Sequence, residues 1–367
     1  MAVGQAEEST RWWHRPTWRR ALLVARFVVG LGLAALALEA VLGQRGELND
    51  AADYLAGLRW QWAVVAAAAE LAAVVAFAGL QGRLLRSGGV RVGLRPLTGI
   101  TLAGNAINNS LPGGPAFASI FAFRQFRRRG ADDALAGWTI VATTVLAALA
   151  LALLAALGVG LAGGRGNAFG LIGTVVGVLA LAAAVTVLLR RPQVLRAPAV
   201  AAVTLSRRVT GWPGTEPEEL VAQGLARILA VSPGRADLAR ALAWALGNWV
   251  FDCACLVAAF LALGAPVPWR ALLLAYGAGQ LAANLPITPG GLGVVEGSLT
   301  IALVAFGGAR PSTVAAVLLY RIVSFWAALP VGWGVWAFLV FRDRRQDRRE
   351  DRDEPVGPVS EPEGVGA

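Results

Sequence analysis

Two short stretches, Leu-Pro-Gly-Gly at 111–114 and Thr-Pro-Gly-Gly at 288–291, interrupt long apolar segments of the chain. Proline lacks an amide proton and glycine allows unusual backbone angles, so this pattern breaks an α-helix. Sixteen residues after the last glycine of each stretch stands another glycine, Gly130 or Gly307, so one offset of 177 residues aligns both features. Broken helices at corresponding positions of two halves are typical of membrane transporters with an inverted repeat.

The composition is that of a membrane protein. The 367 residues are 56% hydrophobic and 15% charged, with a mean hydropathy of +0.59, whereas about a quarter of the residues in a soluble domain are charged. The apolar segments lack the polar face that a soluble helical core would need. Six segments are each long enough to cross a bilayer: 20–42, 60–81, 134–161, 168–189, 239–263 and 312–341.

Two further apolar stretches, 97–126 and 270–306, each contain one Pro-Gly-Gly, and each could form a re-entrant hairpin or two short spans. The arginines distinguish these alternatives. With a cytoplasmic N-terminus and two re-entrant hairpins, 26 of the 33 arginines lie in the cytoplasm, five lie outside and two lie within spans. This distribution follows the positive-inside rule, so the first hairpin is predicted to enter from the cytoplasm and the second from outside.

The predicted fold is therefore an all-α polytopic membrane protein with six full spans and two re-entrant hairpins in an inverted repeat. The membrane domain covers 20–341, with repeat units at about 60–161 and 239–341 and a cytoplasmic loop at 190–238. The basic, Trp-rich residues 1–19 form a cytoplasmic tail, and the charged, Pro- and Gly-rich residues 342–367 are expected to form a disordered one. We expect the protein in a bacterial cytoplasmic (inner) membrane, with both termini in the cytoplasm.

Ionisable side chains within spans are functional candidates, because their burial in lipid is costly. Glu296 falls in the first turns of the half-helix after the second break, where the helix dipole favours an anion. Arg321 lies about nine residues into the last span and requires an anion, which is Glu296, a substrate phosphate, or each in turn. The pair predicts a structural salt bridge or a head-group site. At the matching positions of the first unit stand Ser119 and Thr144.

Other polar residues near the breaks and within spans are further candidates. Asp252 follows Asn248 by one helical turn and belongs to a substrate site or to a polar patch for helix packing. Asparagines beside the breaks either satisfy freed backbone groups or bind sugar and phosphate oxygens. The candidate substrate-binding residues are Glu296, Arg321, Asp252, Asn109, Asn284 and Arg124. The predicted hinge residues are Pro112, Gly113, Gly114, Pro289, Gly290 and Gly291.

The sequence carries no recognisable enzyme or metal motif. The one histidine, His14, lies in the N-terminal tail, which excludes a histidine metal site and a Ser-His pair. Cys253 and Cys255 form neither a CxxC redox pair nor a zinc half-site. We expect no metal, no cofactor and no enzymatic activity.

The run Pro-Gly-Gly-Leu-Gly-Val-Val-Glu at 289–296, followed by Leu-Leu-Tyr-Arg-Ile at 318–322, resembles a membrane family. This family is typified by the transmembrane part of lysylphosphatidylglycerol synthase (the YbhN-like, or UPF0104, family). The Asn-rich block at 105–114 resembles the first block of the same family, and the likeness covers about 20–341. The resemblance implies a lipid-flippase-like membrane domain, with Glu296 and Arg321 at positions in family blocks. The chain ends about 25 residues after its last span, so the synthase's soluble aminoacyl-transferase domain, and with it aminoacylation of lipid, is not expected.

The preferred functional hypothesis is a transporter that moves a phospholipid or glycolipid head group across the inner membrane. Its partner is then a membrane lipid, and no nucleic acid is expected. The alternative is a membrane scaffold or accessory subunit of a cell-envelope glycosyltransferase or lipid-modifying system, acting through loop 190–238. A third hypothesis, an intramembrane enzyme using Glu70, Asp252 or Glu296, lacks a recognisable nucleophile–base pair.

Overall fold

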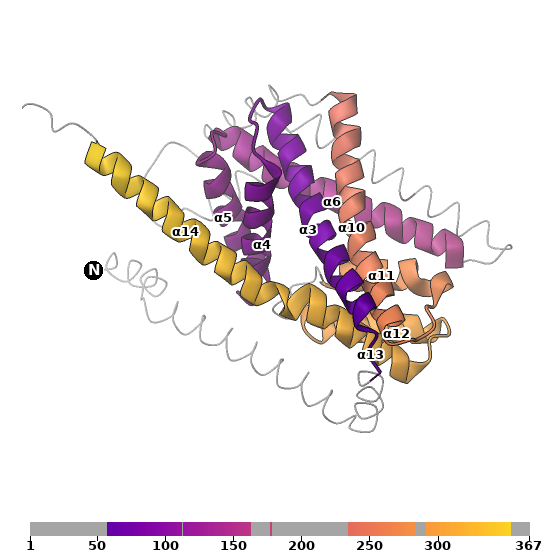
Figure 1. The fold of residues 1–367 in the computed structure, drawn as a ribbon. Helices are drawn as coiled ribbons and strands as arrows, with labels where there is room; N and C mark the ends of the chain where they lie inside the picture. The colour runs from indigo at the N-terminus through magenta and orange to yellow at the C-terminus, as the bar shows by residue number, and fades with distance from the viewer. Residues whose placement is uncertain (1–56, 112, 163–176, 178–233, 284–290, 354–367) are drawn as a thin grey trace, which may run out of the picture.

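The computed structural model describes residues 57–111, 113–162, 177, 234–283 and 291–353 (Figure 1). The predicted span 20–42 lies outside these residues, as does 168–189 apart from Gly177. The predicted loop 190–238 lies outside them up to residue 233. Four predicted site or hinge residues also lie outside the described part of the chain: Pro112, Asn284, Pro289 and Gly290.

The described residues form helices joined by turns. The first set consists of α3 (Trp60–Ser87), α4 (Leu94–Ser110), α5 (Gly114–Arg127) and α6 (Asp133–Ala162). The second set consists of α10 (Arg235–Ala262), α11 (Trp269–Ala283), α12 (Val294–Ala305), α13 (Arg310–Arg321), the π-helical η4 (Ile322–Trp326) and α14 (Ala328–Asp353).

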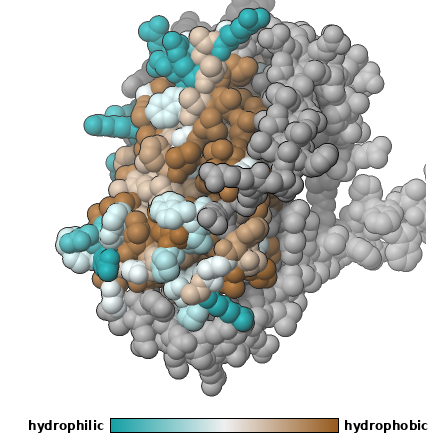
Figure 2. Space-filling view, turned by 90° about the vertical axis from the view of Figure 1, so that its right-hand side faces the viewer, coloured by the Kyte–Doolittle hydropathy of each residue, from teal (hydrophilic) through white to brown (hydrophobic). Residues whose placement is uncertain are grey.

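Four helical stretches of the described chain are long and apolar enough to cross a membrane: Trp60–Ser87, Asp133–Leu161, Arg235–Ala262 and Arg310–Gln346. They coincide with four of the six predicted spans. On the face shown in Figure 2, hydrophobic side chains form a broad area and hydrophilic ones gather mainly toward its margins. This distribution is that of helices whose outer faces contact lipid.

The two sets of helices repeat the same order and spacing. Helices α3 and α10 each contain 28 residues, and both their first and their last residues are 175 positions apart. Helices α4 and α11 also begin 175 positions apart, whereas α6 and α13 begin 177 positions apart. The repeat thus extends well beyond the two Pro-Gly-Gly stretches, and the second unit contains two additional residues around its break.

The repeat is also present in the hydrogen bonds that end the helices. At Gly130 and Gly307, φ is 91° and 100°, a conformation that costs glycine little. Each glycine amide donates to the carbonyl three residues earlier at 3.0 Å, and the next amide donates to the carbonyl five residues before itself at 3.2 and 3.0 Å. The same pattern ends α3 and α10, at Gly89 and Gly264. The two units therefore share backbone geometry as well as helix order.

The equivalent helices α3 and α10 pack against each other in opposite directions (Figure 1). The amide of Arg59, just before α3, donates to the carbonyl of Ala262, the last residue of α10, at 2.7 Å. Farther along α3, Gly79 packs so closely on the ring of Trp244 that an added Cβ would lie 2.7 Å from it. The partner on α10 thus moves toward the start of that helix as α3 advances, so the two units run antiparallel to each other.

Two hydrophobic clusters form the core, one associated with each unit. The first surrounds α4 and α5 and includes Leu97 and Phe126. The second surrounds α11 and α12 and includes Tyr276 and Leu299. Helices α6 and α10 contribute to both clusters, so the two units share one continuous interior.

The last helix differs from its prediction. The expected span 312–341 includes a π-helical segment, η4, and α14 continues to Asp353, twelve residues beyond the predicted end of the membrane domain. Residues 342–353, expected in the disordered tail, are therefore helical. The six arginines, Gln346 and Glu350 have good intrinsic helix propensity, and the segment directly continues α14.

Candidate functional site

The first break separates α4 from α5 by a tight turn. Gly113 has φ of 75° immediately before α5. Gly114 is buried, and a Cβ added to it would lie 2.0 Å from the carbonyl oxygen of Asn108. The predicted helix break is present here, and the approach of the two chain segments explains why a residue with no side chain stands at position 114.

The second break leads into α12 through two glycines with positive φ, Gly291 at 67° and Gly293 at 79°. Glu296 lies in the first turn of this helix, and its Oε2 accepts a hydrogen bond from the amide of Gly293 at 2.7 Å. A carboxylate satisfies an otherwise free amide at the helix start and is favoured by the helix dipole. The predicted location of Glu296 at a helix N-terminus is therefore confirmed.

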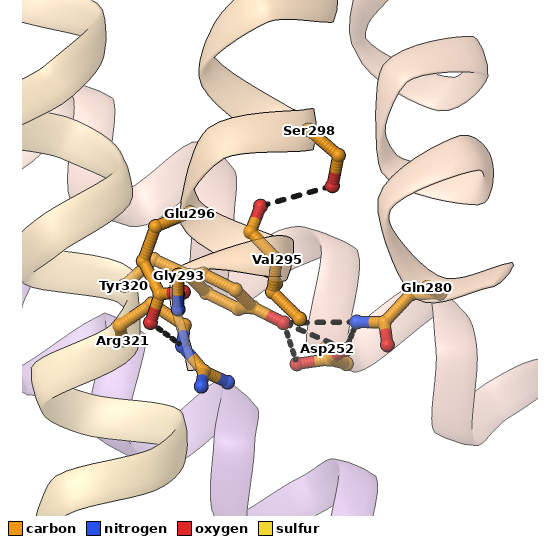
Figure 3. A network of polar contacts seen from close by, with 8 residues as sticks. All are labelled: Asp252, Gln280, Gly293, Val295, Glu296, Ser298, Tyr320 and Arg321. Carbon is orange, nitrogen blue, oxygen red and sulfur yellow. Dashed lines mark hydrogen bonds and ion pairs between the residues drawn. The ribbon is translucent and has the colours of Figure 1, made fainter. Parts of the chain in front are cut away.

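Arg321 lies at the end of α13 and forms an ion pair with Glu296 (Figure 3). Its Nε donates to Glu296 Oε1 at 2.7 Å, and only 8% of the arginine is exposed. The guanidinium carbon lies 4.4 Å from the centre of the Phe325 ring, which adds a cation–π contact. Glu296 thus uses one oxygen to hold its own helix start and the other to hold Arg321.

A second polar cluster surrounds Asp252 in the middle of α10. The hydroxyl of Tyr276 donates to Asp252 Oδ2, and the hydroxyl of Tyr320 lies 3.0 and 3.1 Å from the two carboxylate oxygens. Gln280 Nε2 donates to Asp252 Oδ2 at 2.9 Å and to the Tyr320 hydroxyl at 3.0 Å (Figure 3). Asp252 is 9% exposed, so three donors from α11 and α13 surround a buried carboxylate.

The two clusters are adjacent, because Tyr320 and Arg321 are consecutive residues of α13. Tyr276, Gln280 and Tyr320 are missing from the sequence-based site prediction. The sequence did contain an indication of these residues. The chain has only three tyrosines, and Tyr276 and Gln280 stand one helical turn apart in an apolar helix. Asp252 had been identified, but its partners come from two other helices that the sequence alone does not bring together.

Glu70, a mid-span residue of α3, faces the same cluster. It is half-buried and lies within electrostatic and hydrogen-bonding reach of Asp252. Its Oε2 is shielded from solvent and has no hydrogen-bond partner among the described residues. The site therefore contains a second carboxyl group, contributed by the unit opposite to the one that carries Asp252.

The chemistry of the site is not repeated in the first unit. With the offsets of the two units, Asp252 corresponds to Phe77, and the site residues Tyr276, Gln280, Glu296, Tyr320 and Arg321 correspond to Thr101, Asn105, Ser119, Thr143 and Thr144. The same backbone arrangement thus carries charges and tyrosines in one unit, whereas the other unit carries small hydroxyl or amide side chains and, opposite Asp252, the apolar Phe77. The sequence had predicted this difference for the Glu296 and Arg321 positions alone.

Two predicted site residues lie elsewhere. Asn109 is half-buried near the end of α4, and its Oδ1 accepts a hydrogen bond from Asn108 Nδ2 at 3.2 Å. Arg124 is exposed in the last turn of α5. Neither residue takes part in the hydrogen bonds that hold Glu296, Arg321 and Asp252 in the described structure.

A third polar cluster joins the end of α5 to α14. Gln125 Nε2 donates to Asp343 Oδ2 at 2.7 Å, and Arg129 Nη1 donates to Gln125 Oε1 at 2.5 Å. Burial and the neighbouring Arg342 lower the pKa of the Arg129 guanidinium. These contacts connect the first hairpin to the last helix, and they show that the arginines after α5 serve packing as well as charge.

An apolar hollow of about 350 Å³ lies between α6 and α11, lined by small and aliphatic residues that include Ala152, Ala155, Leu274 and Ala278. Neither Arg321 nor Glu296 lines this hollow. The side chain of Arg321 is 9% exposed and that of Glu296 is 20% exposed, so the described residues largely cover the ion pair.

The fold and site define a class: a polytopic membrane protein that is helical throughout its described residues and is made of two antiparallel units, with a buried ion pair beside the break of the second unit. Sequence comparison assigns the family. The lysylphosphatidylglycerol synthase TM region matches residues 22–332, and the chain belongs to this family. The resemblance found in the sequence motifs is thereby confirmed.

One relative is a UPF0104 membrane protein of Methanothermobacter thermautotrophicus (strain Delta H), with 37% identity over 87 residues. The aligned part is 24% of this chain and 25% of that protein. The chain thus matches about a quarter of the length of this curated relative.

Proposed function

We propose that this protein transports lipid, moving a phospholipid or glycolipid head group from one leaflet of the inner membrane to the other without covalent chemistry. The observation that supports this proposal is the buried ion pair between Glu296 and Arg321 at the start of a half-helix. A guanidinium is well suited to bind a phosphate, and buried charges in membrane segments commonly mark a substrate path.

The proposed topology has six spans and two re-entrant hairpins, α4–α5 entering from the cytoplasm and α11–α12 entering from outside. The antiparallel packing of α3 and α10 supports it, because two equivalent units that run in opposite directions open toward opposite sides. The arginine distribution supports the cytoplasmic location of both termini.

In the proposed mechanism, Glu296 acts as an internal anion that a lipid phosphate replaces. Removing one partner of a buried ion pair costs about 3–5 kcal/mol, whereas exchanging one anion for another keeps the guanidinium compensated. The released Glu296 carboxylate still has the Gly293 amide as a donor and can bind a cationic or hydroxylated part of the head group. Gly291 and Gly293, both with positive φ, would allow α12 to tilt during this exchange.

The experiment is leaflet exchange of labelled lipids with different head groups in vesicles of bacterial membrane lipids that contain the purified protein. We expect one head-group class to exchange faster with the wild type. Arg321→Ala should slow this exchange at least about tenfold, since a charge-assisted contact contributes about 1.5–3 kcal/mol. Arg310→Ala, at the exposed start of the same helix, is the matched control and should exchange like the wild type.

Unchanged exchange in both Arg321→Ala and Glu296→Gln would refute the proposed site. A folded wild-type protein that exchanges no lipid class would refute transport itself. That second outcome would favour the accessory-subunit alternative, which predicts a partner enzyme that copurifies only when loop 190–238 is intact.

A further inference from the structure

Glu70 and Asp252 meet at the crossing of the two equivalent helices. Glu70 lies ten residues after the start of α3, and Asp252 lies ten residues before the end of α10. These two helix ends are joined by the hydrogen bond from Arg59 to Ala262. At 1.5 Å per residue, both carboxyl groups lie about 15 Å from that end, near the middle of a hydrocarbon core about 30 Å thick.

The donors around Asp252 indicate that it is the charged member of this pair. Tyr276, Gln280 and Tyr320 all direct a hydrogen atom toward its carboxylate. Hydrogen bonds to the charged form of a carboxyl group favour that form. The same donors occupy the lone pairs that a sodium ion would need, so the cluster does not resemble a cage of oxygen ligands.

Glu70 has the opposite environment. Its shielded Oε2 has no donor among the described residues, and the charged group that acts on it is the Asp252 carboxylate. Two carboxylates this close cannot both remain ionised without a compensating cation. A protonated Glu70 needs no donor and can itself donate a hydrogen bond to Asp252, which satisfies both groups.

The ionisable groups nearby leave the cluster with an excess of negative charge. Helix α3 contributes Glu70, α10 contributes Asp252, Cys253 and Cys255, α11 contributes Tyr276, α12 contributes Glu296, and α13 contributes Tyr320 and Arg321. The middle part of α6, which also packs here, has no ionisable side chain at positions 146–157. Among the residues that the structure describes, three acids thus face one arginine, and Arg321 is already bonded to Glu296.

We propose that the Glu70–Asp252 carboxyl pair is a proton-binding site that is linked through Tyr320 to anion binding at Arg321. This proposal extends the proposed function, and only its transport step rests on that function. In the resting state the pair holds one proton, on Glu70. When a lipid phosphate reaches Arg321, its negative charge favours uptake of a second proton from water by Asp252, and departure of the phosphate releases that proton. A proton gradient would then drive lipid movement.

The link is reciprocal. If a bound phosphate strengthens proton binding at the pair, a proton at the pair must strengthen phosphate binding by the same factor. Tyr320 is the physical connection, because its hydroxyl bonds Asp252 while the next residue of α13 holds Glu296. Protonation of Asp252 would reverse the direction of the Tyr320 hydrogen bond and disturb the end of α13.

The first experiment observes the proton directly and requires no transport. Infrared difference spectroscopy compares the spectrum of the purified wild type with that of a variant at neutral pH. It distinguishes a protonated from an ionised carboxyl group by the C=O stretching band. We expect the wild type at neutral pH to show the band of a buried protonated carboxyl, and Glu70→Gln to lose it. Asp237→Asn, which removes a half-exposed carboxyl near the start of the same helix as Asp252, is the control and should keep the band. Absence of the band in the wild type, or its persistence in Glu70→Gln, would overturn the proton site.

The second experiment measures lipid exchange in vesicles with and without a pH difference across the membrane. We expect the pH difference to accelerate exchange in the wild type and to have no effect in Asp252→Asn, which keeps the size of the side chain but cannot take up the second proton. If the rate of exchange in the wild type does not depend on the pH difference, the proposed coupling to protons is overturned, whereas the proposed lipid transport is not. A protein that shows the infrared band but exchanges no lipid would instead refute the proposed function and leave the proton site standing.

Discussion

At the scale of single residues, Arg321 has the neighbours that a buried guanidinium requires: a carboxylate, an aromatic ring and a polar cluster beside it. Glu296 is bound on both oxygens, by Arg321 and by the start of its own helix. Both charges are therefore compensated by protein in this conformation. In the proposed mechanism, this arrangement keeps Arg321 available for phosphate without leaving an unsatisfied charge in the membrane.

The energy of this pair can be measured with a double-mutant cycle. We expect Arg321→Gln and Glu296→Gln each to lower the free energy of unfolding, because each leaves a largely buried charge without its main partner. The double variant should be more stable than the sum of the two effects predicts, with an interaction energy of about 1–3 kcal/mol. The measurement is denaturant unfolding in detergent micelles. Strictly additive effects would show that the two side chains do not stabilise each other.

At the scale of the helices, the breaks depend on glycine for two different reasons. Gly113, Gly291 and Gly293 have positive φ, which other residues adopt only with strain. Gly114 instead provides room, because the Asn108 carbonyl occupies the place of its missing Cβ. The two Pro-Gly-Gly motifs therefore encode local geometry that neighbouring side chains cannot replace.

Alanine substitution separates the need for space at Gly114 from the effect of helix propensity. Gly114→Ala should lower the free energy of unfolding by roughly 2–3 kcal/mol or prevent folding, because the new methyl group meets a rigid backbone carbonyl. Gly137→Ala is the matched control: position 137 lies in α6 with open space around it, and alanine should stabilise that helix by about 0.5–1 kcal/mol. Thermal unfolding of the two variants checks both signs. A stable Gly114→Ala protein would contradict the described close approach at the first break.

At the scale of the whole molecule, the two units share a backbone plan and differ in chemistry. Equivalent helices pack antiparallel, so each unit presents its hairpin to the opposite end of the molecule. The charges and tyrosines concentrate in the second unit, whereas Glu70, from the first, completes the cluster. A site shared by two antiparallel units lies where relative movement of the units would alter it, which is consistent with the transport that we propose.

This arrangement predicts that the turn after α3 and the turn after α10 lie on opposite sides of the membrane. In a C253A/C255A background, Arg91→Cys should react with a membrane-impermeant maleimide only after the cytoplasmic side is opened. Pro266→Cys should react in intact cells. Both positions are exposed in the structure, so access to the reagent depends on the membrane alone. Labelling of both positions from the same side would refute the antiparallel topology.

Much of the fold was predictable from the sequence. Four predicted spans correspond to helices of sufficient length, and the offset of 177 reappears in the hydrogen bonds at Gly130 and Gly307. Hydropathy and glycine placement are local properties, and in lipid every backbone group must be satisfied within a helix, so local sequence determines these elements strongly. The helical extension to Asp353 was not predicted, because the charged composition of the tail indicated disorder.

The sequence by itself determined that the chain is a membrane protein with two related broken-helix units, and it identified Glu296, Arg321 and Asp252 as buried charges in need of partners. Only the tertiary structure decided which partners they have. Glu296 and Arg321 are 25 residues apart, and the groups that surround Asp252 come from α3, α11 and α13. The physical reason is that a helix fixes which residues share its own face, whereas contacts between helices depend on packing angles and register that no single segment encodes.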